Sequence, residues 1–154
     1  MIEYINGNLL VLETQNCFIL HGCNSKGSMG AGIAKQIKDQ FPEVFDVYKN
    51  DSRMMGTYTS FHYMDRDLIF VNLITQDSYG RDSKKRYVDY DAVKLSLVQF
   101  VRDLTKLSEY GYQFPKRIAF PRIGAGLGGG DWTIIEKIID ETIPDTYQKV
   151  CYVL

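Results

Sequence analysis

His21 and Asp82 are the two side chains whose types and positions best suit proton transfer. His21 ends the apolar run Cys17 to His21, directly before a group of glycines, where an imidazole can take or give a proton near neutral pH. Asp82 follows the apolar run Leu68 to Thr75, and a carboxylate there can orient a histidine or a water molecule. Two plainer roles stay open: a hydrogen-bonded core histidine for His21 and a solvated loop charge for Asp82.

Three further acids and a second histidine have weaker claims. Asp131 stands just before Trp132, where it either serves as an acid or caps a helix, and capping is the preferred interpretation. Asp77 and Asp89 have the same ambiguity with a less suitable position. His62 lies inside a predicted strand away from the glycines, so we assign it a structural role.

The three cysteines do not suggest a nucleophile. Cys17 and Cys151 lie in apolar runs, and the only histidine near Cys23 is His21, which we place on the opposite face of the strand. Cys23 is therefore expected to line a ligand. The odd count without a Cys-x-x-Cys pair favours free thiols in a reducing compartment. No cluster with metal-ligand spacing is present, so we expect neither a metal nor a cofactor.

Glycines show which segments must position these side chains. Of the 13 glycines, nine fall in two short stretches, residues 22–32 and residues 124–130, called here the first and the second glycine loop. An apolar run precedes each loop, Cys17 to His21 and Arg117 to Pro121, and apolar residues at helical spacing follow each, before Pro42 stops or kinks the first helix. Each glycine loop is thus predicted to join a strand to a helix.

The rest of the chain continues this alternation. Residues 57–64, 68–75 and 150–154 read as strands, and a helix is expected over about 89–107. The pattern predicts an α/β protein, a three-layer α/β/α sandwich with a mixed, largely parallel central sheet, and one domain over residues 1–154.

Composition limits the partners. The chain has 154 residues with 18 basic and 19 acidic side chains, a formal net charge of -1, which disfavours a nucleic acid or a membrane bound through a broad basic face. The N-terminus has no signal-peptide pattern, and no apolar run reaches the roughly 20 residues of a membrane helix. We expect a cytoplasmic monomer, and an anionic small molecule remains compatible with the charge.

Both glycine loops are expected at the ligand-binding edge of the sheet. In α/β proteins, ligands bind beyond the carboxyl ends of the strands, where backbone N–H groups and helix N-termini favour anions. Loops without Cβ atoms let an oxyanion approach the main chain, so no lysine is needed. Neither loop matches the Walker motif or the dinucleotide fingerprint. The pattern favours a diphosphate-containing ligand over glycines that merely make turns.

Three segments, in this order and spacing, resemble those of the macrodomain family of ADP-ribose-binding modules. They are Tyr4 to Leu10, Ile19 to Ala34 with its Gly27-Ser28-Met29-Gly30-Ala31-Gly32 core, and Phe120 to Leu127 before Trp132. The resemblance covers nearly the whole chain. Within the family, the chain is similar to the branch of ADP-ribose-1''-phosphate phosphatases and terminal ADP-ribose glycohydrolases.

The resemblance assigns positions along ADP-ribose. It implies that Asn8 and Leu9 flank the adenine, with asparagine replacing the aspartate of many macrodomains. Gly22, Cys23 and Asn24 would follow the distal ribose. The remaining implied contacts wrap the phosphates from two sides: Met29, Gly30, Ala31, Gly32, Ile33 and Ala34, and Ile123, Gly124, Ala125, Gly126, Leu127 and Gly128. Arg122 could meet a phosphate or point to solvent. His21 matches the catalytic histidine of the phosphatase-like branch.

Departures from the family disfavour one route to removing ADP-ribose. The glycohydrolase branch uses a lysine and an aspartate where this chain has Gln76 and Gly128, and neither replacement can form an adduct or transfer a proton. The resemblance therefore implies hydrolysis of the terminal phosphate of ADP-ribose-1''-phosphate, with His21 and Asp82 as the working pair. Two alternatives stay open: an ADP-ribosyl glycohydrolase or deacylase acting on modified protein or nucleic acid, and a non-catalytic ADP-ribose reader.

One basic segment needs its own interpretation. Residues 81–87 hold four basic side chains near aromatic ones and could touch nucleic acid. A solvated loop is the commoner explanation, so nucleic acid is not an expected partner. Tyr79 or Tyr87 in this region could instead stack on the adenine or line the distal ribose.

Overall fold

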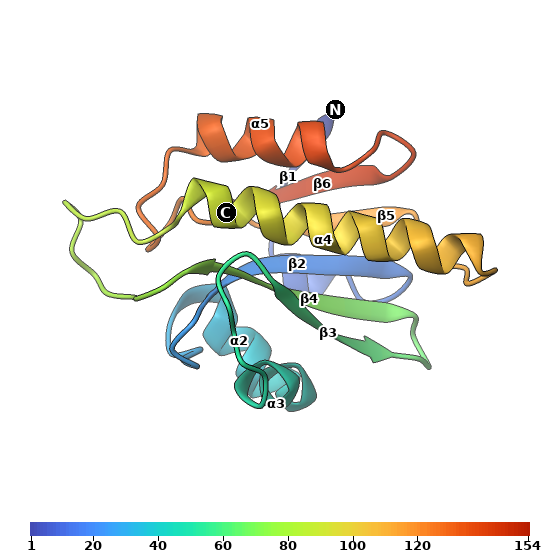
Figure 1. The fold of residues 1–154 in the computed structure, drawn as a ribbon, viewed down its shortest axis with the longest axis horizontal. Helices are drawn as coiled ribbons and strands as arrows, with labels where there is room; N and C mark the ends of the chain where they lie inside the picture. Colours follow the sequence, from blue (N-terminus) through green and yellow to red (C-terminus); the bar gives the residue numbers. More distant parts are fainter.

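One mixed six-stranded sheet organises the whole chain. The structure is a computed structural model that describes residues 1–154. Its elements are β1 (Ile2–Asn6), α1 (Leu9–Leu12), β2 (Cys17–Asn24), α2 (Gly32–Gln40), α3 (Pro42–Lys49), β3 (Tyr58–Tyr63), β4 (Leu68–Gln76), α4 (Tyr90–Glu109), β5 (Arg117–Phe120), α5 (Trp132–Thr142) and β6 (Gln148–Val153). The strand order is β1-β6-β5-β2-β4-β3, and only β3 runs antiparallel, to β4 (Figure 1).

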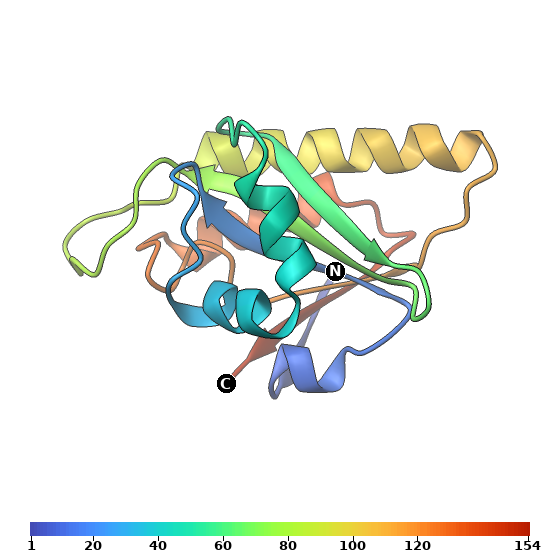
Figure 2. The ribbon, with the colours of Figure 1, turned by 90° about the horizontal axis from the view of Figure 1, so that it is seen from below.

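Helices cover both faces of this sheet, as the sequence predicts. Helices α4 and α5 pack on one face over a core that includes Phe18 and Leu20 of β2, while α1, α2 and α3 cover the other face over Cys17 and Ile19 (Figures 1 and 2). Alternate residues of β2 thus face opposite layers, because side chains alternate along a strand. The three-layer α/β/α prediction is confirmed. None of these helices has both the length and the apolar character needed to cross a membrane.

The carboxyl ends of three neighbouring parallel strands meet at one edge of the sheet. Strand β5 ends at Phe120, β2 at Asn24 and β4 at Gln76, and these strands are adjacent in the order β5-β2-β4. Both glycine loops and the long segment 77–89 leave from this edge, and the latter projects furthest from the body of the molecule (Figure 2). Segments far apart in the sequence are thereby gathered at one place.

Several element boundaries differ from the sequence-based expectation. Strand β2 continues through Gly22 to Asn24, so the first glycine loop begins inside the strand. A Cβ at Gly22 would lie 2.9 Å from Thr75 Oγ1, which explains a glycine in a central strand. Pro42 does not only stop α2: it also begins α3, where its fixed φ suits the first helical turn. Strand β1 and helix α1 were not expected at all.

Candidate functional site

A cavity of about 1050 Å³ opens at the carboxyl edge of the sheet. Both glycine loops, the segment after β4 and the first residue of α5 form its walls. The lining residues are Gly22, Cys23, Asn24, Ser28, Gly30, Ala31, Gly32, Ile33, Ala34, Gln76, Tyr79, Gly80, Arg81, Pro121, Arg122, Ile123, Gly124, Ala125, Gly126, Leu127, Gly128, Gly130 and Trp132. This volume lies just above the usual range for small-molecule sites, which is roughly 300–1,000 Å³.

The second glycine loop presents unpaired backbone donors to this cavity. The N–H groups of Gly124, Gly126, Leu127 and Gly128 have no hydrogen-bond acceptor within the protein. Their carbonyls are used instead: Gly124 O accepts from Gly130 N at 2.8 Å, and Gly128 O accepts from the N–H groups of Tyr87 and Val88 at 2.7 and 3.0 Å. Carbonyl oxygens therefore help to hold the loop, while the N–H groups of these four residues stay available to an anion.

Close packing requires glycine at two positions of this loop. A Cβ at Gly128 would lie 2.6 Å from Gly124 O, and Gly124 itself has φ +73° with Val88 2.7 Å from the place of a Cβ. Neither position accepts a side chain without movement of the loop. The glycines thus shape the second wall of the cavity.

Side chains, rather than packed backbone, hold the first glycine loop. Asn24 Oδ1 accepts from the backbone N–H groups of Lys26 and Ser28, and Asn24 Nδ2 donates to Ser28 O at 2.9 Å. The buried Tyr48 of α3 donates to Asn24 O at 2.6 Å. Asn24 lines the cavity, but its amide is already committed to folding this turn.

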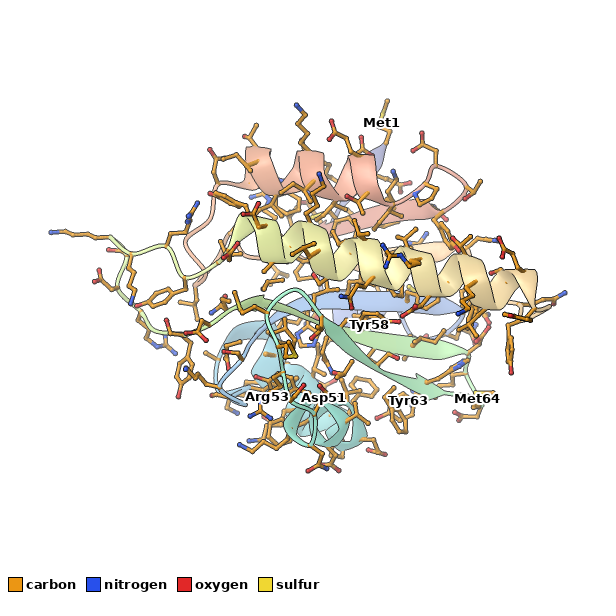
Figure 3. The ribbon with its side chains drawn as sticks, in the orientation of Figure 1. Met1, Asp51, Arg53, Tyr58, Tyr63 and Met64 are labelled. Carbon is orange, nitrogen blue, oxygen red and sulfur yellow. The ribbon has the colours of Figure 1, made fainter.

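Arg53 supports the same turn from outside. Its Nε donates to Ser25 O at 3.0 Å, and its backbone N–H donates to Asp51 Oδ1 at 3.2 Å. Figure 3 shows Arg53 and Asp51 side by side next to α3. The position of the first glycine loop therefore depends on Tyr48 in α3 and on Asp51 and Arg53, which follow α3. The sequence alone gave no signal for this role.

Helix α2 begins at the cavity without a cap. Its N-cap position is Ala31, which has no side chain able to accept a hydrogen bond from the first turn. The first N–H groups of a helix have no partner within the helix, so those of Gly32, Ile33 and Ala34 remain free. Gly30 and Ala31 N–H also have no acceptor in the protein. The open end of α2 and the second glycine loop thus line the same cavity.

His21 lies beneath the cavity, not in it. Its side chain is fully buried, and its Nε2 lies 2.5 Å from Asn72 Oδ1 of β4. Asn72 in turn donates to Val44 O and Thr59 Oγ1. Burial lowers the pKa of His21 to about 4, against the opposing effect of the Asn72 hydrogen bond, so the imidazole is neutral at pH 7. This environment matches the hydrogen-bonded core histidine that was the alternative interpretation.

The predicted separation of Cys23 from His21 is wrong. The two residues are two positions apart in β2, so their side chains point to the same face, and Cys23 Sγ lies 3.6 Å from His21 Nε2. Cys23 lines the cavity, whereas His21 does not. Burial raises the pKa of Cys23, which keeps the sulfur as a thiol.

Asp82 and His21 do not form a pair in this structure. Asp82 is exposed on the segment after β4, where its Oδ1 accepts from Lys84 N at 3.0 Å. Its neighbours Gly80 and Arg81 line the cavity, whereas Asp82 does not. The segment after β4 therefore reaches the ligand-binding edge, as expected. It does so through Gly80 and Arg81 rather than through Asp82.

The remaining predicted ligand residues divide into two groups. Most of both glycine loops lines the cavity, but Asn8, Leu9 and Met29 do not. Asn8 caps α1 by accepting from Leu10 N at 3.0 Å, and Leu9 and Met29 are buried in the core. Their predicted contacts with adenine and phosphate would require the ligand to extend beyond this cavity.

Six lining residues were given no ligand contact by the sequence analysis: Ser28, Gly80, Arg81, Pro121, Gly130 and Trp132. Ser28 lay within the quoted motif and Gly130 in the second glycine loop, so both carried a signal that was not used. Gly80 and Arg81 precede Asp82 in a segment already expected at this edge. Arg122, for which a phosphate contact and a solvent-facing position were both open, lines the cavity and is exposed. Gln76 also lines the cavity, and its side chain donates to Ser78 O.

The other acids have structural partners. Asp131 Oδ1 accepts from Thr133 N at 2.9 Å and Asp89 Oδ1 from Ala92 N at 3.1 Å, so both cap helices. The capping role preferred for Asp131 is confirmed. Asp77 accepts from Ser25 Oγ, and that hydrogen bond, helped by the nearby Lys26, lowers the pKa of the Asp77 carboxyl. No group of three or more His, Cys, Asp and Glu side chains is arranged to hold a metal ion.

A second depression, of about 640 Å³, lies at the opposite edge of the sheet, near the amino ends of the strands. Its lining includes Arg117, whose guanidinium is paired with Glu13, and Asp145, which pairs with Lys149 at 3.0 Å. These charges neutralise one another, and neither glycine loop reaches this depression. The cavity between the glycine loops is therefore the candidate site.

Two named relatives match about nine-tenths of this chain. The ADP-ribose 1''-phosphate phosphatase of Saccharomyces cerevisiae is 27% identical, over 91% of this chain and 92% of that protein. The DNA ADP-ribosyl glycohydrolase of Mycobacterium tuberculosis is 31% identical over 89% of this chain, but the chain spans only 37% of that longer protein. No family model matches the sequence.

Solved structures carry the same fold. The macrodomain of Mycobacterium tuberculosis DarG superposes with a TM-score of 0.78 at 24% identity, covering 100% of this chain and 98% of that one. The chain belongs to the macrodomain family. Thermosipho africanus DarTG in complex with ADP-ribose also matches this macrodomain, with a TM-score of 0.77 at 19% identity over 99% of this chain and 42% of that one. The macrodomain thus has ADP-ribose-binding and hydrolase relatives.

Proposed function

We propose that the protein binds ADP-ribose in the cavity between its glycine loops and removes the terminal phosphate of ADP-ribose-1''-phosphate. One observation carries the binding proposal. Free N–H groups of the second glycine loop and of the α2 N-terminus line the same cavity. Backbone donors and a helix dipole together stabilise a diphosphate without a basic side chain. This accounts for an anionic ligand on a chain of net charge -1.

The ends of the cavity fit the two ends of ADP-ribose. Trp132 lies at the β5 side, where its Nε1 donates to Tyr4 Oη at 2.9 Å, and it offers an aromatic surface for the adenine. Cys23 and Gln76 lie at the ends of β2 and β4, on the opposite side of the diphosphate cradle. The distal ribose is proposed to lie there, with its C1'' group toward the segment after β4.

In the proposed reaction, a water oxygen attacks the terminal phosphorus and the bond from phosphorus to the C1'' oxygen breaks. The C1'' oxygen takes up a proton, and the products are ADP-ribose and inorganic phosphate. The yeast phosphatases support this activity, because the Saccharomyces protein matches along nine-tenths of both chains. N–H groups at the cradle would stabilise the charge on the phosphate oxygens in the transition state.

Proton transfer requires an acid or a base close to the terminal phosphate. Neither His21 nor Asp82 lines the cavity, so their catalytic roles stay predictions. Asp82 is adjacent in the sequence to the lining residue Arg81, and its proposed role is to orient the attacking water. His21 would act only through Cys23, which lines the cavity and whose Sγ lies 3.6 Å from His21 Nε2.

A non-catalytic ADP-ribose reader is the second candidate, because no histidine and no carboxylate lines the cavity. Such a site can bind a diphosphate but offers no acid or base next to it. Removal of ADP-ribose from nucleic acid or protein, the third alternative, draws support from the mycobacterial relative's name. Gln76 in the cavity weighs against a lysine-dependent route, since an amide does not form an adduct with C1''.

A product assay with parallel calorimetry separates these functions. The protein is incubated without divalent metals with ADP-ribose-1''-phosphate, with ADP-ribosylated protein and with ADP-ribosylated DNA, and released phosphate and ADP-ribose are measured. Phosphate release from the first substrate alone supports the proposal. ADP-ribose binding without either product leaves the reader, and absence of ADP-ribose binding removes the whole functional account.

Variants then test the two predicted acid–base residues. Asp82→Asn and His21→Gln are compared with Asp65→Asn, an exposed acid in the turn between β3 and β4 at the other edge of the sheet. Loss of phosphate release in Asp82→Asn, with Asp65→Asn unchanged, supports a role for Asp82. Full activity in both His21→Gln and Asp82→Asn would rule out the predicted pair.

A further inference from the structure

Two arginines line opposite ends of the candidate cavity. Arg122 follows β5 and Arg81 follows β4, and β2 with the first glycine loop lies between these strands. The charge of Arg122 opposes the rise in the pKa of Cys151 that burial causes, which places Arg122 toward β6. Arg81 is therefore the cation on the side of the cradle where the distal ribose is proposed to lie.

Arg81 differs from the other cations of its segment. Lys85 Nζ lies over the ring of Tyr87 at 5.0 Å, and the Arg86 guanidinium lies over Tyr90 at 4.3 Å. Lys84 does not line the cavity. Arg81 lines it and makes no ion pair or hydrogen bond within the protein. Its guanidinium is free to meet an anionic group of a ligand.

The segment that carries Arg81 is folded back on itself and anchored at both ends. Gln76 and Val88 form an antiparallel bridge, and Val88 N donates to Gly128 O at 3.0 Å. Further out, Gly80 lies against Tyr87 so closely that a Cβ at Gly80 would overlap the tyrosine hydroxyl. This contact holds Arg81 on the cavity side, so that its charge has a defined place relative to the second glycine loop.

We propose that Arg81 is a specificity residue that recognises a phosphate group on the distal ribose of the ligand. The inference rests on the proposed function, because it requires ADP-ribose to bind with its distal ribose toward β4. A planar guanidinium can donate two parallel hydrogen bonds to phosphate oxygens, and such charge-assisted bonds are stronger than neutral ones. Arg81 thus distinguishes ADP-ribose-1''-phosphate from ADP-ribose.

The test compares the two ligands in matched variants. Arg81→Gln removes the charge at the cavity, and Lys84→Gln removes a charge from the same segment away from it. ADP-ribose binding is measured by calorimetry. For ADP-ribose-1''-phosphate, KM and kcat are measured, or its Kd if the protein does not hydrolyse it.

We expect Arg81→Gln to weaken recognition of ADP-ribose-1''-phosphate by about 30-fold, seen in KM or Kd, because one charge-assisted interaction is lost. ADP-ribose affinity should change less than about threefold, since that ligand lacks the group that Arg81 contacts. Arg81→Lys should restore part of the preference, because the charge returns without the paired geometry. Lys84→Gln should change neither ligand.

Other outcomes separate the two levels of the account. If the unmodified protein does not bind ADP-ribose, the proposed function fails and this inference fails with it. If it binds ADP-ribose but Arg81→Gln affects both ligands equally or neither, the inference alone is overturned. An equal effect of Arg81→Gln and Lys84→Gln would show a general charge effect of the segment rather than specific recognition.

Discussion

Helices α2 and α5 begin in comparable places, but their N-termini are capped differently. Each follows a glycine loop at the carboxyl edge of the sheet, and the first residue of each lines the same cavity. At α5, Asp131 accepts a hydrogen bond from Thr133 N and puts a negative charge on the helix N-terminus. At α2, Ala31 leaves the N-terminus open. Only α2 can therefore accept a ligand anion at its first turn.

The two glycine loops also differ in the contacts that hold them in place. Side chains from β2 and α3, notably Asn24 and Tyr48, hold the first loop, whereas backbone hydrogen bonds and close packing on Val88 hold the second. The first loop is thus adjustable by side-chain substitution, and the second is fixed by the absence of side chains. A binding site built this way combines one open helix end with one rigid row of N–H groups.

The largest effect is expected when α2 is made to resemble α5. Ala31→Asp adds an acidic cap to α2, which should stabilise the unliganded protein by about 1 kcal/mol and lower ADP-ribose affinity by about 100-fold, because the carboxylate takes the free N–H groups and repels the diphosphate. Thermal unfolding and calorimetric titration measure the two effects.

Ala31→Asn is the matched control, since it caps the helix without a charge. It should stabilise the protein similarly and lower the affinity by only about tenfold. Unchanged ADP-ribose affinity in Ala31→Asp would show that the α2 N-terminus does not hold the diphosphate.

The strands leading to the two loops should also differ in their response to pH. Strand β2 carries the buried His21, whereas the buried residues of β5 are all apolar. Because burial lowers the pKa of His21 from 6.5 to about 4, the unfolded chain binds a proton first as the pH falls. Stability should thus fall by about 2 kcal/mol between roughly pH 7 and 5 through this residue. Denaturant titrations of the protein and of His21→Gln measure this, and an equal pH dependence in both would contradict it.

A smaller effect is expected at the support of the first glycine loop. Tyr48→Phe removes the hydroxyl that donates to Asn24 O at 2.6 Å inside the core. Leaving that buried carbonyl without its partner should cost about 1.5 kcal/mol of stability and weaken ADP-ribose binding severalfold. Urea unfolding with a parallel ligand titration tests both, with Tyr63→Phe, whose hydroxyl contacts the exposed Glu43, as control.

The smallest effect should come from the cap of α5. Asp131→Ala removes the acceptor of Thr133 N and should cost about 1 kcal/mol of stability. ADP-ribose affinity should stay the same or rise slightly, because a negative charge near the cavity is lost. A marked loss of affinity would mean that Asp131 contacts the ligand and that the two helix ends are not different in function.

Sequence reasoning reached the layers of the fold and most of the cavity, because apolar periodicity and clustered glycines are local signals. It placed α4 correctly and identified the cap at Asp131. It did not identify Arg81 as a residue of the cavity. In an irregular segment, the residue that faces a cavity is set by contacts within the folded segment, such as that of Gly80 with Tyr87.

His21 is a residue that the sequence suggested for catalysis and that the structure buries. A histidine at the end of a strand before a glycine loop suits acid–base chemistry, but β2 continues for three further residues and buries it beneath Cys23. The side chain that buries and binds it, Asn72, belongs to another strand. Strand ends are set by pairing with neighbours, which a single sequence does not show.

Amide proton resonances of the labelled protein, recorded while ADP-ribose is added, test the central claim most directly. Bound phosphate oxygens should shift the amide protons of Gly30, Gly32, Gly124, Gly126 and Gly128 downfield, because these N–H groups acquire acceptors. Gly111, which follows α4 away from the cavity, should not move. ADP-ribose binding that leaves the resonances of both glycine loops unchanged would contradict the account.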